Sequence, residues 1–183
     1  MASRLALALG IGVVAFVSTL GDYVWFEIGI GHRPAAGILH GALLLTTVGG
    51  VLGATAGRLA RGLPLGAVAG VMGALAYYAL APVTGSTGAM VAAWCALWVV
   101  LALLDGRRLA RTRRPVAVDF GRGAVAALVG GLAFFLLVGT LWGHPVGSRN
   151  YLVQFVAWTA AWAPGLATIV LTRPRTSGPD TPR

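Results

Sequence analysis

The sequence contains no lysine and few charged residues of any kind. Charged residues make up 10% of its 183 residues, whereas hydrophobic residues make up 57%. A soluble domain carries about 25% charged residues, so this composition excludes an ordinary water-soluble domain. The single cysteine, Cys95, excludes an intrachain disulfide and a CxxC redox or zinc pair. Its position within an apolar run predicts a small packing residue.

Catalytic signatures are also missing. The sequence has no GxSxG, HExxH, Walker or dinucleotide-binding pattern, so we do not expect an enzyme. The net charge of +9 does not indicate nucleic-acid binding, because the arginines edge the apolar runs and no nucleic-acid-binding motif accompanies them. We expect them instead to contact anionic lipid headgroups of a cytoplasmic leaflet. Their densest group consists of Arg107, Arg108, Arg111, Arg113 and Arg114.

Six apolar runs fill most of the chain. A helix needs about 20 apolar residues to cross the hydrocarbon core, and in lipid the backbone polar groups must be satisfied within the helix. The sequence therefore predicts an all-α polytopic membrane bundle of six helices in one transmembrane domain, residues 1–172. Residues 105–122 are expected to form its longest loop, and residues 173–183 a disordered cytoplasmic tail. The predicted helices cover residues 5–26, 37–57, 64–83, 87–104, 123–142 and 151–171.

The arginines predict the orientation of these helices. All fourteen basic residues are arginines, and twelve of them lie in alternate gaps, while the other gaps hold only Arg33 and Arg149. Cytoplasmic loops are enriched in Lys and Arg, so both termini are predicted to be cytoplasmic. Abundant alanine, glycine and arginine are typical of a GC-rich bacterial genome. We therefore expect a multi-pass protein of the bacterial cytoplasmic (inner) membrane.

An internal repeat accompanies this topology. Residues 66–80 and 123–137 agree at eight of fifteen positions, and the tryptophans of Trp94-x-x-x-Trp98 recur as Trp158-x-x-x-Trp162. The first two helices form a weaker third copy. Repeats of the same orientation are related by an axis along the membrane normal. The sequence thus predicts three antiparallel hairpin repeats.

Glycines at four-residue spacing mark two helix faces, Gly49-Gly53-Gly57 and Gly62-Gly66-Gly70. Small residues at this spacing let helix backbones approach closely in lipid. Two uses are open: packing between neighbouring helices of the chain, or association with a second copy or with other membrane subunits.

Polar and aromatic residues gather toward the predicted outer side. Asp22 and Glu27 are the only acids outside the predicted cytoplasmic segments, and intramembrane acids are costly and often functional. They would supply charge or proton coupling. Alternatively, Asp22 reaches water or pairs with Arg33 or Arg149. The candidate ligand-binding residues are Asp22, Glu27, His40, Tyr77, Trp94, Gln154 and Trp158.

The paired tryptophans are expected to lie deep in their helices. A deep indole N–H needs a hydrogen-bond partner. The pairs either fill the interface between repeats or line a pocket for a flat or apolar ligand.

Pro164 in the middle of the last helix is a candidate hinge, because broken helices near the midplane often mark transporter sites. A static kink is the alternative.

The histidines do not predict a metal or haem site. Imidazole and carboxylate are suitable ligands, but the spacing of His32, His40 and His144 matches no known signature. We therefore expect no metal and no cofactor.

In size, number of helices and cytoplasmic termini, the chain is similar to the substrate-capture subunits of energy-coupling-factor vitamin importers. Those subunits dock through small residues on the first helix, and Ala8-x-x-x-Gly12 is a loose counterpart. The resemblance implies a non-enzymatic capture protein. The residues themselves predict a membrane protein that binds or transports a small molecule through an outward-facing site. The alternative is a structural or accessory subunit of a larger membrane complex with no ligand of its own.

Overall fold

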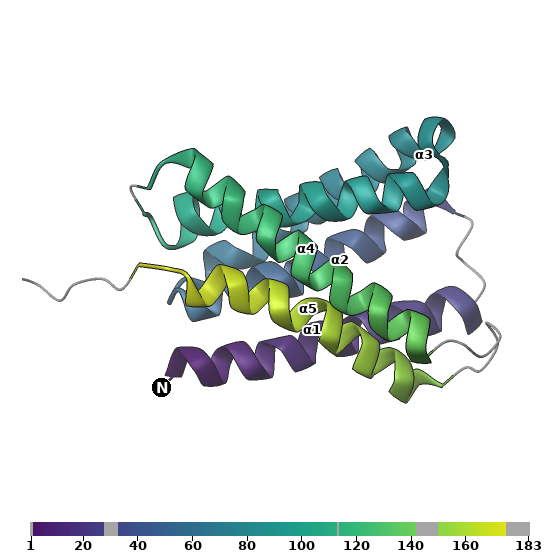
Figure 1. Cartoon of the computed structure of the whole chain (residues 1–183), viewed down its shortest axis with the longest axis horizontal. Helices are drawn as coiled ribbons and strands as arrows, with labels where there is room; N and C mark the ends of the chain where they lie inside the picture. Colours follow the sequence, from purple (N-terminus) through teal and green to yellow (C-terminus); the bar gives the residue numbers. More distant parts are fainter. Residues whose placement is uncertain (1, 28–32, 113, 142–149, 175–183) are drawn as a thin grey trace, which may run out of the picture.

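The computed structural model describes residues 2–27, 33–112, 114–141 and 150–174, and in these residues it is all-helical without strands. His32, Arg113, His144, Arg149 and the predicted tail from residue 175 lie outside the described residues. The helices are α1 (Ala2–Glu27), α2 (Pro34–Thr55), α3 (Leu59–Leu104), the short π-helix η1 (Asp105–Leu109), α4 (Val116–Leu141) and α5 (Tyr151–Leu171) (Figure 1).

Within the described part of the chain, five helices are long and apolar enough to cross a membrane. Their outer surfaces are apolar as well, with Leu9 63%, Phe16 60% and Leu128 61% exposed. Large apolar side chains in such numbers would be costly to expose to water, and lipid is the solvent that suits them. The predicted class, a membrane protein built of transmembrane helices, is therefore supported.

Helix α3 contains two of the predicted spans, 64–83 and 87–104. Its 46 residues would extend about 69 Å if straight, more than twice the thickness of the hydrocarbon core. The helix is interrupted at Gly85, whose φ of 74° and ψ of 164° are non-helical, and the ribbon reverses direction in this region (Figure 1). We refer to residues 59–84 as the first arm and residues 86–104 as the second arm. Both arms line one cavity, so they lie side by side.

The predicted loop at 105–122 is wrong. Helical structure continues through η1 to Leu109, and α4 begins at Val116 rather than at residue 123. The reason is a group of buried charges: Asp105 and Asp119 each pair with Arg122, so this polar segment packs inside the protein as helix. The other predicted boundaries agree within a few residues, and that of the last helix agrees at both ends.

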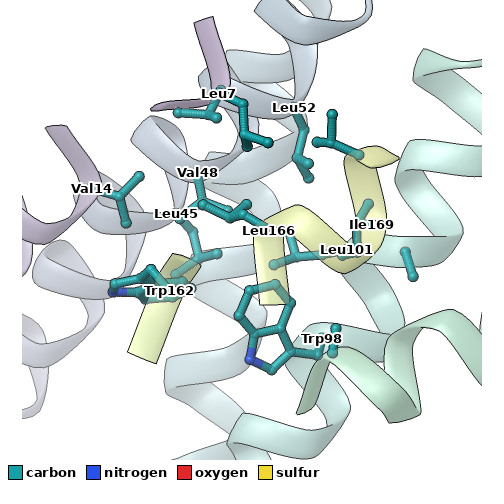
Figure 2. Close-up of a cluster of buried hydrophobic side chains, with 14 of the residues drawn as sticks. Leu7, Val14, Leu45, Val48, Leu52, Trp98, Leu101, Trp162, Leu166 and Ile169 are labelled. Carbon is teal, nitrogen blue, oxygen red and sulfur yellow. The ribbon is translucent and has the colours of Figure 1, made fainter. Parts of the chain in front are cut away.

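The hydrophobic core contains residues from all five long helices (Figure 2). Leu7 and Val14 of α1 and Leu52 of α2 meet Trp98 from the second arm and Trp162 from α5. The two tryptophans are 0% and 1% exposed. Helices α1 and α5 run side by side through this region (Figure 1).

The spaced glycines bring α2 and the first arm into backbone contact. A Cβ atom added to Gly49 would lie 2.7 Å from the Cα of Gly66, and one added to Gly53 would lie 3.0 Å from the Cα of Gly62. These four glycines are buried. Their faces are therefore used for packing within the chain, the first of the two uses expected from their spacing.

Candidate functional site

An apolar groove of about 860 Å³ lies between the second arm of α3, α4 and one side chain of α5. The second arm and α4 diverge from their connection near residues 105–115 (Figure 1). Small residues on α4, namely Ala124, Ala127 and Gly131, leave the space between the two helices unfilled. The larger side chains that line the groove include Trp94, Val99, Phe120, Leu128, Phe134 and Trp158.

The groove opens sideways, toward the surface that faces lipid. Leu128 and Leu132 line it and are 61% and 52% exposed. Its lining on α4 extends from Phe120 to Phe134, about 21 Å at the rise of an α-helix. Half of the hydrocarbon core is about 15 Å thick. The groove is thus long enough to reach the middle of a bilayer from its edge.

Cys95 lines this groove and is exposed. The expectation that Cys95 is a small packing residue is wrong, because its side chain lies on an exposed wall of the groove.

The paired tryptophans converge from the second arm and α5. The ring centres of Trp94, Trp98 and Trp162 lie 5.3–5.7 Å from one another. Trp94 lines the groove and donates its indole N–H to the carbonyl of Ala127 at 3.1 Å. Trp98 and Trp162 belong to the core. One member of each pair, Trp94 or Trp158, therefore lines the groove, while the other fills the interior.

Trp158 lines the groove from α5 and is held from two sides. Its indole N–H donates to the Asp22 carboxylate of α1 at 2.6 Å, and its ring lies 5.1 Å from that of Phe134 with an interplanar angle of 30°. Asp22 thus contacts a residue that lines the groove without lining it itself. Neither Arg33 nor any other described arginine forms an ion pair with Asp22.

His40 and Tyr77 line a second, smaller cavity of about 270 Å³ between α2 and the two arms of α3. Met90 and Trp94, one helical turn apart on the second arm, line both cavities and so separate them. The His40 ring packs against Gly21 of α1, where an added Cβ would come 2.9 Å from Nε2. The second cavity therefore lies next to the groove, on the other side of Met90 and Trp94.

The remaining predicted residues line neither cavity. Glu27 accepts a hydrogen bond from the Tyr151 hydroxyl at 2.8 Å, where α1 ends and α5 begins. The Oε1 of Gln154 is buried and has no hydrogen-bond partner among the residues that the structure describes. Pro164 lies inside α5, which is assigned as helix on both sides of it, so its role as a hinge stays a prediction. The described residues contain no group of three potential metal ligands.

Sequence analysis missed a buried network of charges at the opposite end. Arg122 donates to Asp119 at 2.8 Å and to Asp105 at 3.1 Å, and both carboxylates are fully buried. Arg173 contacts Asp105 through two nitrogens and donates to Thr55 of α2 at 3.0 Å. The network joins α2, η1, α4 and α5. The available signal was the i, i+3 spacing of Asp119 and Arg122 just before an apolar run.

Arg107 extends this network to the exposed surface. Its Nε lies 3.8 Å from the Oδ2 of Asp119, and its side chain is 39% exposed. Asp119 precedes Phe120, which lines the groove, and Arg108 beside Arg107 is exposed. An apolar groove with exposed arginines close in sequence to one of its lining residues is suited to an amphiphile with an anionic head.

Comparison with protein-family models, curated proteins and solved structures finds no match for this chain. The similarity to energy-coupling-factor subunits therefore stays an analogy of topology. The function has to be argued from the groove and its surroundings.

Proposed function

We propose that the protein is a multi-pass protein of the bacterial cytoplasmic membrane that binds an amphiphilic small molecule with a long apolar chain. The chain occupies the groove between the second arm of α3 and α4, and the molecule enters sideways from the bilayer. The single observation that carries the proposal is the apolar groove of about 860 Å³, open on its lipid-facing side. Transport of the same molecule between leaflets is the further role that this binding would serve.

The chemistry of the lining supports an apolar ligand. Binding sites for small molecules measure about 300–1,000 Å³ and are lined mainly by apolar and aromatic side chains. The only lining side chains that carry a hydrogen-bond donor are Trp94, Trp158 and Cys95. Both indole N–H groups already donate within the protein. A polar ligand would find few free partners there, whereas an acyl or isoprenoid chain needs none.

The charges near the groove support an anionic headgroup. Arg107 pairs with Asp119, the residue before Phe120 of the groove lining, and Arg108 follows Arg107 in the sequence. Arginine binds phosphate oxygens in a bidentate manner. In the proposed orientation, with six spans and both termini inside, these two arginines are cytoplasmic. An anionic phospholipid of the inner leaflet matches both features. Entry of the ligand from the outer side, near Asp22 and Glu27, stays a second possibility.

Fluorescence quenching by a brominated lipid tests the proposal. Purified protein in mild detergent is titrated with an anionic phospholipid carrying bromine on its acyl chains, which quenches nearby tryptophans. We expect saturable quenching, because Trp94 and Trp158 line the groove. Ala124→Phe should fill the groove and remove the saturable component. Ala79→Phe, at an exposed alanine of the first arm outside the groove, is the matched control and should leave it unchanged.

The headgroup is tested with the same titration. Arg107→Gln with Arg108→Gln should weaken binding of the anionic lipid but not of a zwitterionic lipid with the same chains. Arg61→Gln, an exposed arginine on another helix, is the control. Quenching that never saturates, or that Ala124→Phe leaves intact, contradicts binding in the groove.

The accessory-subunit alternative is favoured by one observation. Ala96 and Ala124, on the two walls of the groove, are small and exposed, and small residues permit close approach of a partner helix. A photo-crosslinker attached to Cys95 in native membranes separates the two functions. Crosslinks to lipid support the proposed binding role, whereas a reproducible crosslink to one protein supports a subunit role.

A further inference from the structure

Two polar residues of α1 accept hydrogen bonds from two tryptophans of α5. Asp22 accepts from Trp158 at 2.6 Å, and one turn away Ser18 accepts from Trp162 at 3.0 Å. Asp22 and Ser18 are four residues apart, as are the two tryptophans, so the pairs form a ladder between antiparallel helices. The ladder gives the deep indoles of α5 the partners that buried N–H groups need.

The two tryptophans of this ladder differ in their burial. Trp162 is 1% exposed and belongs to the core, where its neighbours fix its ring from every side. Trp158 is only partly buried, lines the groove and has open space on one face. A ring with space beside it can rotate unless its N–H is held. The hydrogen bond therefore matters more for the orientation of Trp158 than for that of Trp162.

We propose that Asp22 is a positioning residue for the groove: it holds the Trp158 ring against Phe134 and so keeps the space beside this ring open. This inference rests on the proposed function, because it assigns Asp22 a role in the same binding site. In the described part of the chain the Trp158 indole is the hydrogen-bond partner found for this carboxylate, and a charged acceptor makes a stronger bond than a neutral one. Without the bond, the ring turns into the space that the apolar chain occupies.

The first test measures affinity for the brominated anionic lipid. Asp22→Ala removes the acceptor and should weaken binding about tenfold, which corresponds to about 1.4 kcal/mol. Asp22→Asn keeps an acceptor oxygen and should stay within about threefold of the wild type. Ser18→Ala removes the hydrogen bond between Ser18 and Trp162 and is the matched control. It should lower thermal stability without changing affinity.

The second test needs no lipid. Cys95 is the single thiol of the chain and lines the same groove as Trp158. If the ring turns into the groove, Asp22→Ala should change the rate at which a membrane-permeant maleimide alkylates Cys95. Ser18→Ala should not change this rate.

The outcomes separate the two proposals. If the wild type shows no saturable lipid binding but Asp22→Ala still changes the alkylation rate of Cys95, the proposed function fails and the positioning role stands. If the wild type binds lipid and Asp22→Ala alters neither affinity nor alkylation, the positioning role is overturned. Equal effects of Asp22→Ala and Ser18→Ala on affinity also overturn it, because they would indicate general packing between α1 and α5.

Discussion

Arg122 lies at the centre of the buried charge network. Its guanidinium donates to two carboxylates, to the carbonyl of Ile169 and to the hydroxyl of Thr172, and its side chain is 7% exposed. Burying ions costs several kcal/mol each, and their attraction offsets this cost only when the geometry is good and the remaining groups are hydrogen-bonded. Asp105 meets this condition through Arg122 and Arg173. Asp119 depends on Arg122 and, more distantly, on Arg107.

Arg122→Met should therefore destabilise the protein strongly. The substitution keeps much of the side-chain volume but leaves the buried Asp119 carboxylate without its nearest cation. Breaking a buried pair costs about 3–5 kcal/mol. For a chain of this size, each kcal/mol lowers the melting temperature by about 2–4 °C, so we expect a loss of roughly 6–20 °C in detergent.

Arg61→Gln is the matched control for this measurement, since Arg61 is exposed and should change the melting temperature by no more than about 2 °C. Equal melting temperatures for Arg122→Met and the wild type would mean that the network contributes little to stability.

At the scale of elements, the reversal within α3 depends on one glycine. Gly85 has a positive φ with an extended ψ, a combination that is essentially restricted to glycine. Pro82 and Gly85 together end the first arm, because proline cannot continue the backbone hydrogen-bond ladder and glycine permits the turn. The reversal brings Trp94 next to α2 on one side and α4 on the other. The groove and the smaller cavity both depend on this arrangement.

Gly85→Ala should cost about 1–3 kcal/mol, because alanine is strained at this φ and ψ whatever space surrounds it. An added Cβ meets no atom within 4 Å, so any loss would report backbone strain alone. Gly73→Ala is the matched control: it lies in the helical first arm, where an added Cβ also meets nothing. Alanine there favours the helix by about 1 kcal/mol. Thermal unfolding of the two variants should thus shift in opposite directions, and a shift of the same sign would contradict this account of the turn.

Sequence patterns predicted the apolar helices well because their signal is local. Length, hydropathy and helix breakers are properties of neighbouring residues, and they indicated the break between residues 83 and 87 as well as the course of α5. The burial of Asp105 and Asp119 depends on arginines up to 68 residues away in the sequence. Hydropathy counts such residues as loop, so the N-terminal extension of α4 could not be predicted.

The same contrast holds for the candidate site. Residue type alone indicated that Trp94 and Trp158 were candidates for a pocket, and both line the groove. The groove itself is an absence of side chains between two diverging helices, and no single residue signals it. Asp22 was a candidate because of its charge. Its hydrogen-bond partner is the indole of Trp158, 136 residues later in the sequence.

The proposed topology predicts on which side of the membrane each turn of the protein lies. Six spans with both termini inside place the turn at Gly85 outside the cell and the segment between η1 and α4 inside. The arginine distribution supports this orientation, because twelve of the fourteen arginines lie in gaps or chain ends that it places inside, and only Arg33 and Arg149 lie in gaps that it places outside. A five-span arrangement, in which α3 crosses once, would put these two segments on the same side.

Cysteine accessibility distinguishes the two arrangements. Replacing Cys95 with alanine gives a thiol-free background, into which Ser86→Cys or Thr112→Cys is introduced. An impermeant maleimide added to intact cells should label Ser86→Cys and should label Thr112→Cys only after the membrane is opened. Both positions are at least partly exposed, so accessibility to the reagent depends on the side of the membrane rather than on burial in the protein. Labelling of Thr112→Cys in intact cells would place the arginine-rich segment outside. This result would contradict the proposed contacts of Arg107 and Arg108 with the inner leaflet.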